Sequence, residues 1–144
     1  MTASALPSNP CTAPEDAPLC VRRDARGVVT LTLNDSARFN ALGSEMLAAL
    51  QQALDAIAQD DSVRVVVLAG AGKAFCAGHN LKDMAAHPEL AWYHQLFAQC
   101  NRVMLSLYKL PVPVIARVQG MATGALCQLV AQCDLAVAAE GTIF

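Results

Sequence analysis

The sequence predicts an α/β fold built on parallel strands, and three observations indicate it. Residues 63–69 are almost uniformly apolar, which is typical of a central strand with helices over both faces. Residues 114–118 form a second apolar strand, which runs into a glycine-containing turn and then into a helix. An apolar stripe with helical spacing separates the two. Strands therefore alternate with helices, and right-handed crossovers between parallel strands give an α/β sheet.

The first part of the chain is expected to hold a lead-in and a hairpin. Residues 1–17 combine proline with serine, threonine and alanine and contain no lysine or arginine, so we expect a disordered segment before a domain at 18–144. Leu19–Arg23 and Val28–Asn34 flank a turn that contains Gly27, and apolar residues alternate with threonines in the second segment. This alternation predicts a hairpin with one buried face.

Two long helices and a last strand complete the predicted elements. The first helix begins near Ser44, which we expect to cap it, and its apolar residues keep helical spacing as far as Ile57. The second helix covers about 89–110, and Pro111 ends it. Its apolar stripe is typical of a face packed in the core. The last strand is expected at 135–139.

Two glycine-containing turns connect predicted strands to helices. The first is KAFCAGHNL at 73–81, and the second covers 119–124. The first amides of a helix have no partner within the helix, so they stabilise an oxygen that develops negative charge. Two turns that aim one amide each at a single point would form an oxyanion hole for an acyl thioester.

Three segments, KAFCAGHNLKDM, PVPVIARVQGMA and CQLVAQCDLAVA, resemble those of the enoyl-CoA hydratase/isomerase (crotonase) superfamily. The resemblance covers residues 18–144 and implies a spiral of repeated ββα units, truncated before its C-terminal part. It implies an acyl-CoA substrate of fatty acyl-CoA metabolism, whose thioester oxygen accepts hydrogen bonds from the backbone amides of His79 and Ala125. Coenzyme A is part of that substrate, and neither a separate cofactor nor a metal is expected.

The resemblance also implies a set of substrate-binding residues. Those of the two turns and the adenine-binding loop are Ala77, Gly78, Gly124, Ala37, Arg38 and Phe39. Lys82 follows one turn after His79, where the family often has a lysine directed at a phosphate. Arg38 is equally well explained as a solvated loop cation, because it has no partner visible in the sequence. Lys82 has the better claim, although lysines on a helix surface are usually solvated.

Two positions depart from the family pattern. Gln128 stands where the hydratases have the first of two glutamates, and an amide has no titrating proton to exchange. The second glutamate would follow Phe144. Leu126 stands where relatives of this type generally have glycine, so its side chain is expected to narrow the acyl pocket or displace the helix.

These departures leave three hypotheses open. The chain is an acyl-CoA hydratase or isomerase of weak activity, or a non-catalytic acyl-CoA-binding pseudoenzyme, or a truncated product that persists by association with a full-length relative. We expect a homo-oligomer, a trimer or hexamer by family, or such an association, because 55% of the residues are hydrophobic.

Composition narrows the remaining function classes. A net charge of −2 gives no electrostatic signature of nucleic-acid or membrane-surface binding, and no apolar run is long enough to span a membrane. The N-terminal residues match neither a secretory nor a mitochondrial signal, so we expect a cytoplasmic protein. The six cysteines lack metal-ligand spacing and are expected to be free in a reducing compartment. Cys76, in the first turn, is expected to be a packed thiol and not a nucleophile.

Overall fold

A five-stranded sheet organises the computed structural model, which describes residues 17–144 apart from the side chain of Leu126. The strands are β1 (Leu19–Arg23), β2 (Val28–Leu33), β3 (Val65–Gly70), β4 (Val114–Val118) and β5 (Leu135–Ala138). They lie in chain order across the sheet, and β1 and β2 form the predicted antiparallel hairpin. The pairs β2–β3, β3–β4 and β4–β5 are parallel. The prediction of a disordered lead-in falls outside the described residues, except at Ala17, whose carbonyl oxygen accepts a hydrogen bond from the Asn34 side chain.

The helices follow the strands as predicted, with one correction. They are η1 (Ser36–Arg38), α1 (Ser44–Ala58), α2 (Leu81–Ala86), α3 (Leu90–Tyr108) and α4 (Ala125–Ala131). Ser44 does not cap α1, because it is already the first helical residue and Gly43 occupies the cap position without a side-chain hydrogen bond. Such shifts of one residue at a helix end are ordinary.

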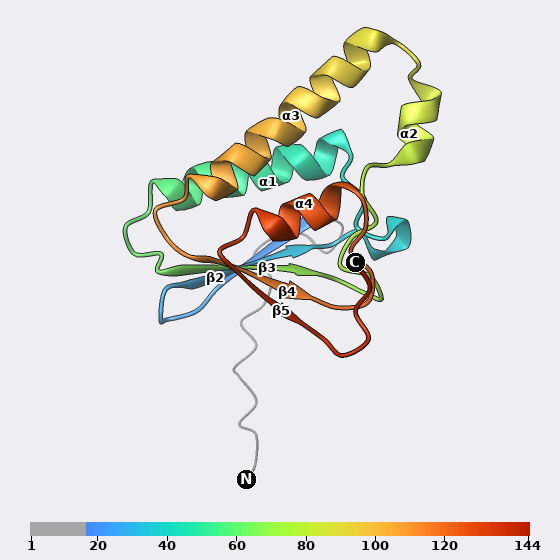
Figure 1. Cartoon of the computed structure of the whole chain (residues 1–144). Coiled ribbons are helices and arrows are strands. Elements are labelled where there is room, and N and C mark those ends of the chain that lie inside the picture. Colours follow the sequence, from blue (N-terminus) through green and yellow to red (C-terminus); the bar gives the residue numbers. More distant parts are fainter. Residues whose placement is uncertain (1–16) are drawn as a thin grey trace.

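The helices α1, α3 and α4 lie on one face of the sheet, so the expectation that helices cover both faces is wrong for the described residues (Figure 1). Strand side chains that point toward the helices are buried, among them Val66, Leu68 and Ala116. Their neighbours on the opposite face are half-buried at Val67 and exposed at Arg117. The apolar run at 63–69 was misleading, because the sequence does not distinguish half-buried valines on the open face from buried valines in the core.

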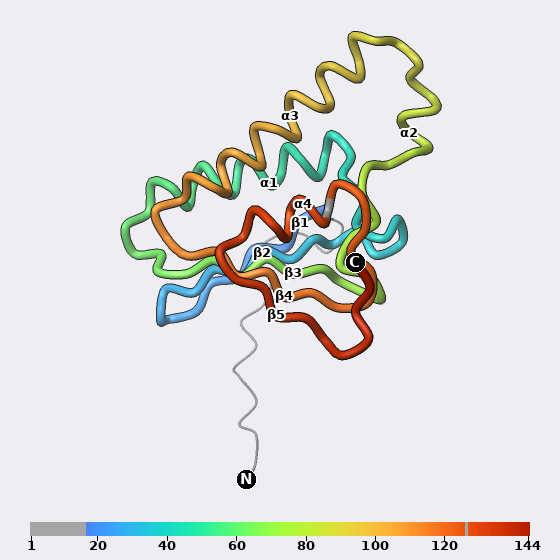
Figure 2. Tube along the Cα trace, in the orientation of Figure 1, coloured from blue at the N-terminus to red at the C-terminus, as the bar shows by residue number. Residues whose placement is uncertain are grey.

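A second, very short parallel ladder runs beside the main sheet and shows that the chain is built from a repeated unit. Its rungs are single bridges that pair Leu42 with His79, Cys76 with Ala122, and Met121 with Ile143. Each main strand from β2 onward is followed by one of these short segments, and a helix follows the first three of them (Figure 2). The molecule is therefore a spiral of ββα units.

The core lies between the helices and the covered face of the sheet. It joins apolar residues of α1 and α3 to those of β2, β3 and β4. The stripe predicted on α3 is largely confirmed, since Leu96, Cys100, Val103, Met104 and Leu107 are buried. Phe97, from the same stripe, keeps 42% of its surface exposed. The edge of this core holds the two turns.

Candidate active site

The first turn, residues 74–80, is largely buried and is hydrogen-bonded to the loop that precedes α1. Ala74, Phe75, Cys76 and Gly78 are buried. The Ala77 amide donates to the Phe39 carbonyl at 3.0 Å, and the Leu42 amide donates to the Gly78 carbonyl at 2.8 Å. The adenine-binding loop and the first turn that the resemblance named are thus neighbours joined by backbone hydrogen bonds.

Asn40 fixes this junction, and sequence reasoning missed it. Its side chain is fully buried, and its Nδ2 donates to the carbonyl oxygens of Ala71, Ala74 and Phe75 at 2.8, 3.0 and 3.1 Å. Its Oδ1 accepts from the Asp35 amide at 2.9 Å. The residue has a φ of 53°, in the left-handed region that asparagine tolerates better than most residues. An asparagine inside a polar loop was the only available signal.

The second turn lies against the first. Gly78 and Gly124 have φ values of 93° and 62°, in the region that favours glycine. A β-carbon placed on Gly78 would lie 3.4 Å from the Thr123 carbonyl oxygen and 3.8 Å from the Ala125 amide nitrogen. The backbone of the first turn therefore reaches the start of α4, as the sequence suggested. Across residues 17–144, neither the His79 amide nor the Ala125 amide has a hydrogen-bond partner.

The His79 side chain is already engaged. Its Nδ1–H donates to the Leu42 carbonyl oxygen at 3.3 Å, and its ring meets the Phe97 ring edge to face at 5.3 Å between centroids. No carboxylate accepts a hydrogen bond from the ring within the described chain. The geometry thus leaves the backbone of His79, and not its imidazole, open at the meeting point of the turns.

Gln128 lies three residues after Ala125 on the exposed side of α4. Residues three apart lie on the same face of a helix, so Gln128 lies on the same face of α4 as Ala125. Its side chain makes no hydrogen bond to any described residue. The prediction about the Leu126 side chain lies outside what the structure describes.

The predicted substrate loop is exposed, and its cation is paired. Ala37, Arg38 and Phe39 are all exposed around η1. Arg38 Nε lies 2.7 Å from Asp35 Oδ2, so the sequence view of Arg38 as a cation without a partner is corrected by an ion pair. Lys82 is exposed at the start of α2, where the Asn80 side chain accepts from the backbone amides of Lys82 and Asp83.

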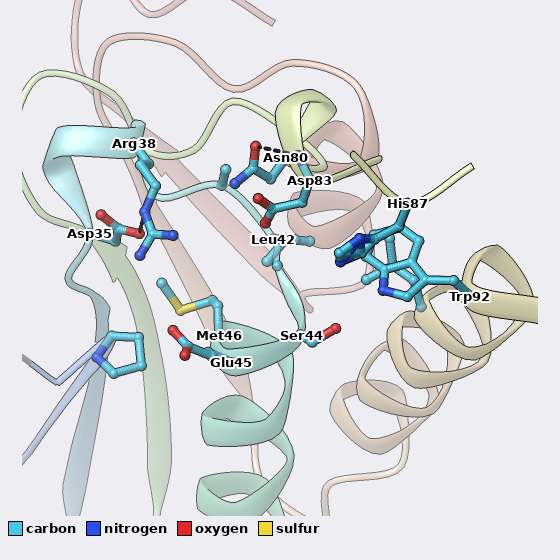
Figure 3. Close-up of a pocket in the computed structure, with 14 residues that line it drawn as sticks. Asp35, Arg38, Leu42, Ser44, Glu45, Met46, Asn80, Asp83, His87 and Trp92 are labelled. Atoms are coloured by element: carbon cyan, nitrogen blue, oxygen red, sulfur yellow. Dashed lines mark hydrogen bonds and ion pairs between the residues drawn. The ribbon is translucent and has the colours of Figure 1, made fainter. Parts of the chain in front are cut away.

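A cavity of about 320 Å³ lies beside the turns, between η1, the start of α1 and the α2–α3 corner. Arg38 and Asn80 line it, together with the carboxylates of Asp35, Glu45 and Asp83 (Figure 3). His79, Ala125 and Gln128 are not part of its lining. Within this cavity the carboxylates outnumber the one arginine, and Arg38 is paired with Asp35, so its contact with a phosphate stays a prediction.

The cysteines differ from one another. Burial raises the pKa of the Cys76 thiol to about 12, and its Sγ donates to the Asn40 carbonyl oxygen, so this residue is a packed thiol as expected. The expectation that all cysteines are free is wrong at Cys20, which is disulfide-bonded. Cys20 lies half-buried on the edge strand β1. Cys76, Cys100, Cys127 and Cys133 are free.

Within residues 17–144, no three His, Cys, Asp or Glu side chains lie close enough together to hold a metal ion. No helix in this part of the chain is both long and apolar enough to cross a membrane.

A ββα spiral in which two glycine turns lie against each other defines a class of protein, and comparison with known families identifies that class. The family described as enoyl-CoA hydratase/isomerase matches residues 23–144. The chain therefore belongs to the enoyl-CoA hydratase/isomerase family, the crotonase superfamily that its motifs resemble.

Individual relatives agree with this assignment. Enoyl-CoA hydratase domain-containing protein 3, mitochondrial, of Xenopus laevis is 39% identical over 127 residues, which are 88% of this chain and 43% of the relative. The 1,2-epoxyphenylacetyl-CoA isomerase of Escherichia coli (strain K12) is 39% identical over 124 residues, 83% of this chain and 47% of that protein. A crystal structure of enoyl-CoA hydratase from Mycobacterium smegmatis superposes with a TM-score of 0.85 at 60% identity, covering 87% of this chain and 49% of that one. The chain spans about half the length of the relatives it matches.

Proposed function

We propose that this chain binds an acyl-CoA thioester, with the thioester oxygen accepting hydrogen bonds from the backbone amides of His79 and Ala125. The observation that carries the proposal is the contact between Gly78 and the start of α4, beside two amides without partners. An acyl thioester develops negative charge on its oxygen when it becomes an enolate, and two convergent amide donors stabilise that charge. Family membership supports the same substrate class.

Hydration of an enoyl thioester needs more than this pair of donors. A base must activate water and an acid must protonate the α-carbon, and each positioned group contributes on the order of 10²–10⁴-fold. Gln128, at the position of the family's first glutamate, can orient a water molecule but cannot exchange a proton with it. Gln128 therefore favours the second hypothesis for this chain, a non-catalytic acyl-CoA-binding pseudoenzyme.

Gly78→Ala tests the binding site directly. Its methyl group would lie 3.8 Å from the Ala125 amide nitrogen, beside the position proposed for the thioester oxygen. We expect at least a tenfold loss of affinity for crotonyl-CoA and a smaller loss for free coenzyme A, measured by calorimetry. An equal loss for both ligands would contradict the assignment of these amides.

Gly141→Ala is the matched control. Gly141 has a φ of 80°, and a β-carbon there meets no atom within 4 Å, so this variant carries the backbone strain without the obstruction. It should bind crotonyl-CoA like the unmodified chain. Loss of binding in both variants would mean that strain, and not the position of the methyl group, is responsible.

The activity test separates binding from catalysis. The chain should bind crotonyl-CoA while the absorbance of the enoyl thioester stays nearly constant. Rapid hydration, in a preparation free of host hydratases, would overturn the role given to Gln128.

We also propose that the chain associates in solution, as a homo-oligomer or with a longer relative, and that it acts in the cytoplasm. The support for association is apolar exposure: Leu135, Val137, Ile143 and Phe144 each keep at least 59% of their surface exposed. Exposed apolar patches beyond a few hundred Å² usually mark interaction surfaces. A monodisperse monomer in sedimentation at micromolar concentration would contradict association.

A further inference from the structure

We propose that the acyl group bound by this chain carries an aromatic ring, which packs against Phe97 and Tyr93 of α3. The inference rests on the proposed function, because it names the acyl substituent of the same thioester. It comes from a row of rings that begins at His79.

The rings form a connected series along the start of α3. Phe97 meets His79 edge to face at 5.3 Å and stacks on Tyr93 at 6.4 Å with an interplanar angle of 25°. Beyond Tyr93 the series continues through Trp92 to His87, with centroids 5.6 and 4.8 Å apart. Edge-to-face and offset arrangements at these distances are those that aromatic pairs prefer.

Hydrogen bonds fix the two rings that flank Phe97, those of Tyr93 and His79. The Tyr93 hydroxyl donates to the Met84 carbonyl oxygen at 2.7 Å, which ties α3 to the end of α2. On the other side, the His79 ring is held by the Leu42 carbonyl oxygen. Two rings held in place before a ligand arrives lose little conformational freedom on binding.

The Phe97–Tyr93 pair lies on the side of α3 that faces the turns, and not on the side that packs beside α1. Gln99 Nε2 donates to the Ser44 carbonyl oxygen at 3.0 Å, which identifies the side of α3 that packs beside α1. Residues two apart in a helix point in nearly opposite directions, so Phe97 lies on the other side of α3. There it contacts His79, whose preceding residue Gly78 lies against the start of α4.

Phe97 has surface left for a ligand. It remains 42% exposed although it belongs to the predicted core stripe, and Tyr93 is half-buried. A thioester held at the His79 amide places its acyl group within reach of the residue that His79 contacts. A saturated chain would gain only apolar burial there, whereas an aromatic ring would also gain the ring–ring interaction.

The test compares two thioesters of the same shape. Phenylacetyl-CoA and cyclohexylacetyl-CoA share one carbon skeleton, but only the first has an aromatic ring, and the second is the more hydrophobic. Calorimetric titration of the whole chain should show phenylacetyl-CoA binding about two- to tenfold more tightly, which is the effect of one to a few ring–ring contacts.

Two variants assign that preference to the ring pair. Phe97→Leu keeps an apolar side chain and should bring the ratio of the two dissociation constants to about one. Tyr108→Leu removes a 74% exposed ring from the same helix, away from the series, and should leave the ratio unchanged.

Each other outcome overturns the inference. Equal binding of both thioesters by the unmodified chain, or an unchanged ratio in Phe97→Leu, would refute the aromatic preference while the proposed function stands. Failure of both thioesters to bind, under conditions where the chain is folded by circular dichroism, would refute the proposed function and this inference together.

Discussion

The two turns of the candidate site meet at one point but are supported differently. The first turn is buried, and Asn40 holds its carbonyl groups from within. The second turn is exposed at Gly120, Met121 and Gly124, and all of β5 that follows is exposed as well, whereas α4 is exposed only at Cys127, Gln128 and Ala131 among its described side chains. The buried Asn40 side chain fixes the first turn, whereas the second is held by the part-buried side chain of Gln119, which donates to the Gly70 carbonyl oxygen, and by backbone bonds such as that from the Ala122 amide to the Ile143 carbonyl oxygen.

This difference indicates how changes in each turn should act. A buried polar group that loses its partners is costly, whereas an exposed one exchanges them for water. Changes in the first turn should therefore lower the free energy of unfolding. Changes at exposed side chains beside the second turn, such as Gln128, should alter chemistry while stability stays nearly constant, whereas Gly120 and Ala122 within the turn are tightly packed.

Asn40→Ala should have the largest effect. It removes the donor for three buried carbonyl oxygens and places alanine at a left-handed φ, so we expect a loss of about 3 kcal/mol in the free energy of unfolding. Urea denaturation measures this loss. Asn101→Ala, at an exposed position on α3, is the control and should change stability by less than about 0.5 kcal/mol. A loss below about 1 kcal/mol for Asn40→Ala would mean that water replaces the side chain.

The pH dependence of stability should reveal the buried thiol of the first turn. Burial raises the pKa of Cys76 to about 12 from an ordinary value of 9.0, so the fold favours the neutral thiol. The stabilisation is complete below about pH 9 and is lost as the pH rises toward 12. Cys133, whose pKa is also raised to about 12 by burial, adds to the same decline. Urea denaturation between pH 8 and pH 11 should show a smaller decline for Cys76→Ala than for Cys127→Ala, which changes an exposed residue; equal declines would contradict this.

Asn80→Ala should have a smaller effect, confined to α2. The Asn80 side chain accepts from the amides of Lys82 and Asp83, and loss of such a cap costs about 1 kcal/mol. Hydrogen exchange should accelerate in 81–86 but not in α3. Asn80→Asp keeps the acceptor and should restore protection, and faster exchange throughout the chain would show that the cap supports more than α2.

Gln128→Glu should have the smallest effect on stability, within about 0.5 kcal/mol, because the residue is exposed. It adds one base beside the proposed amide pair, so slow α-proton exchange on a saturated acyl-CoA should appear by NMR while hydration stays absent. Gln132→Glu, one turn further along α4, is the control and should give no exchange. Hydration by Gln128→Glu alone would show that one carboxylate suffices.

Local patterns predicted the elements well, because local chemistry determines them. Val114–Val118 is confirmed to the residue, and both glycine turns lie where the sequence placed them. The errors concern relations across the fold. An almost uniformly apolar strand does not reveal that one face lacks a helix, and isolated cysteines do not reveal that Cys20 is bonded.

The candidate site shows the same contrast between local features, which the sequence predicts, and contacts across the fold, which it does not. The positions of the two turns were predictable, because the conformation that glycine permits is a local property, whereas the sequence left open whether the turns would meet. Asn40 could not be assigned a role, because its three acceptor carbonyls belong to a segment distant in sequence. The series of rings from His79 to His87 likewise depends on how α2 and α3 pack, which periodicity does not give.

The short ladder of bridges has a consequence for the order of folding. Its rungs pair Leu42 with His79, Cys76 with Ala122, and Met121 with Ile143, so each joins segments far apart along the chain. Contacts between distant segments form slowly, because the chain loses the entropy of loop closure before the contacts stabilise it. The hairpin of β1 and β2 can form early, whereas Gly78 and Gly124 meet only after two later ββα units have docked. The two amides are therefore expected to come together late in folding. A ligand that binds them would bind only the folded state and would stabilise it.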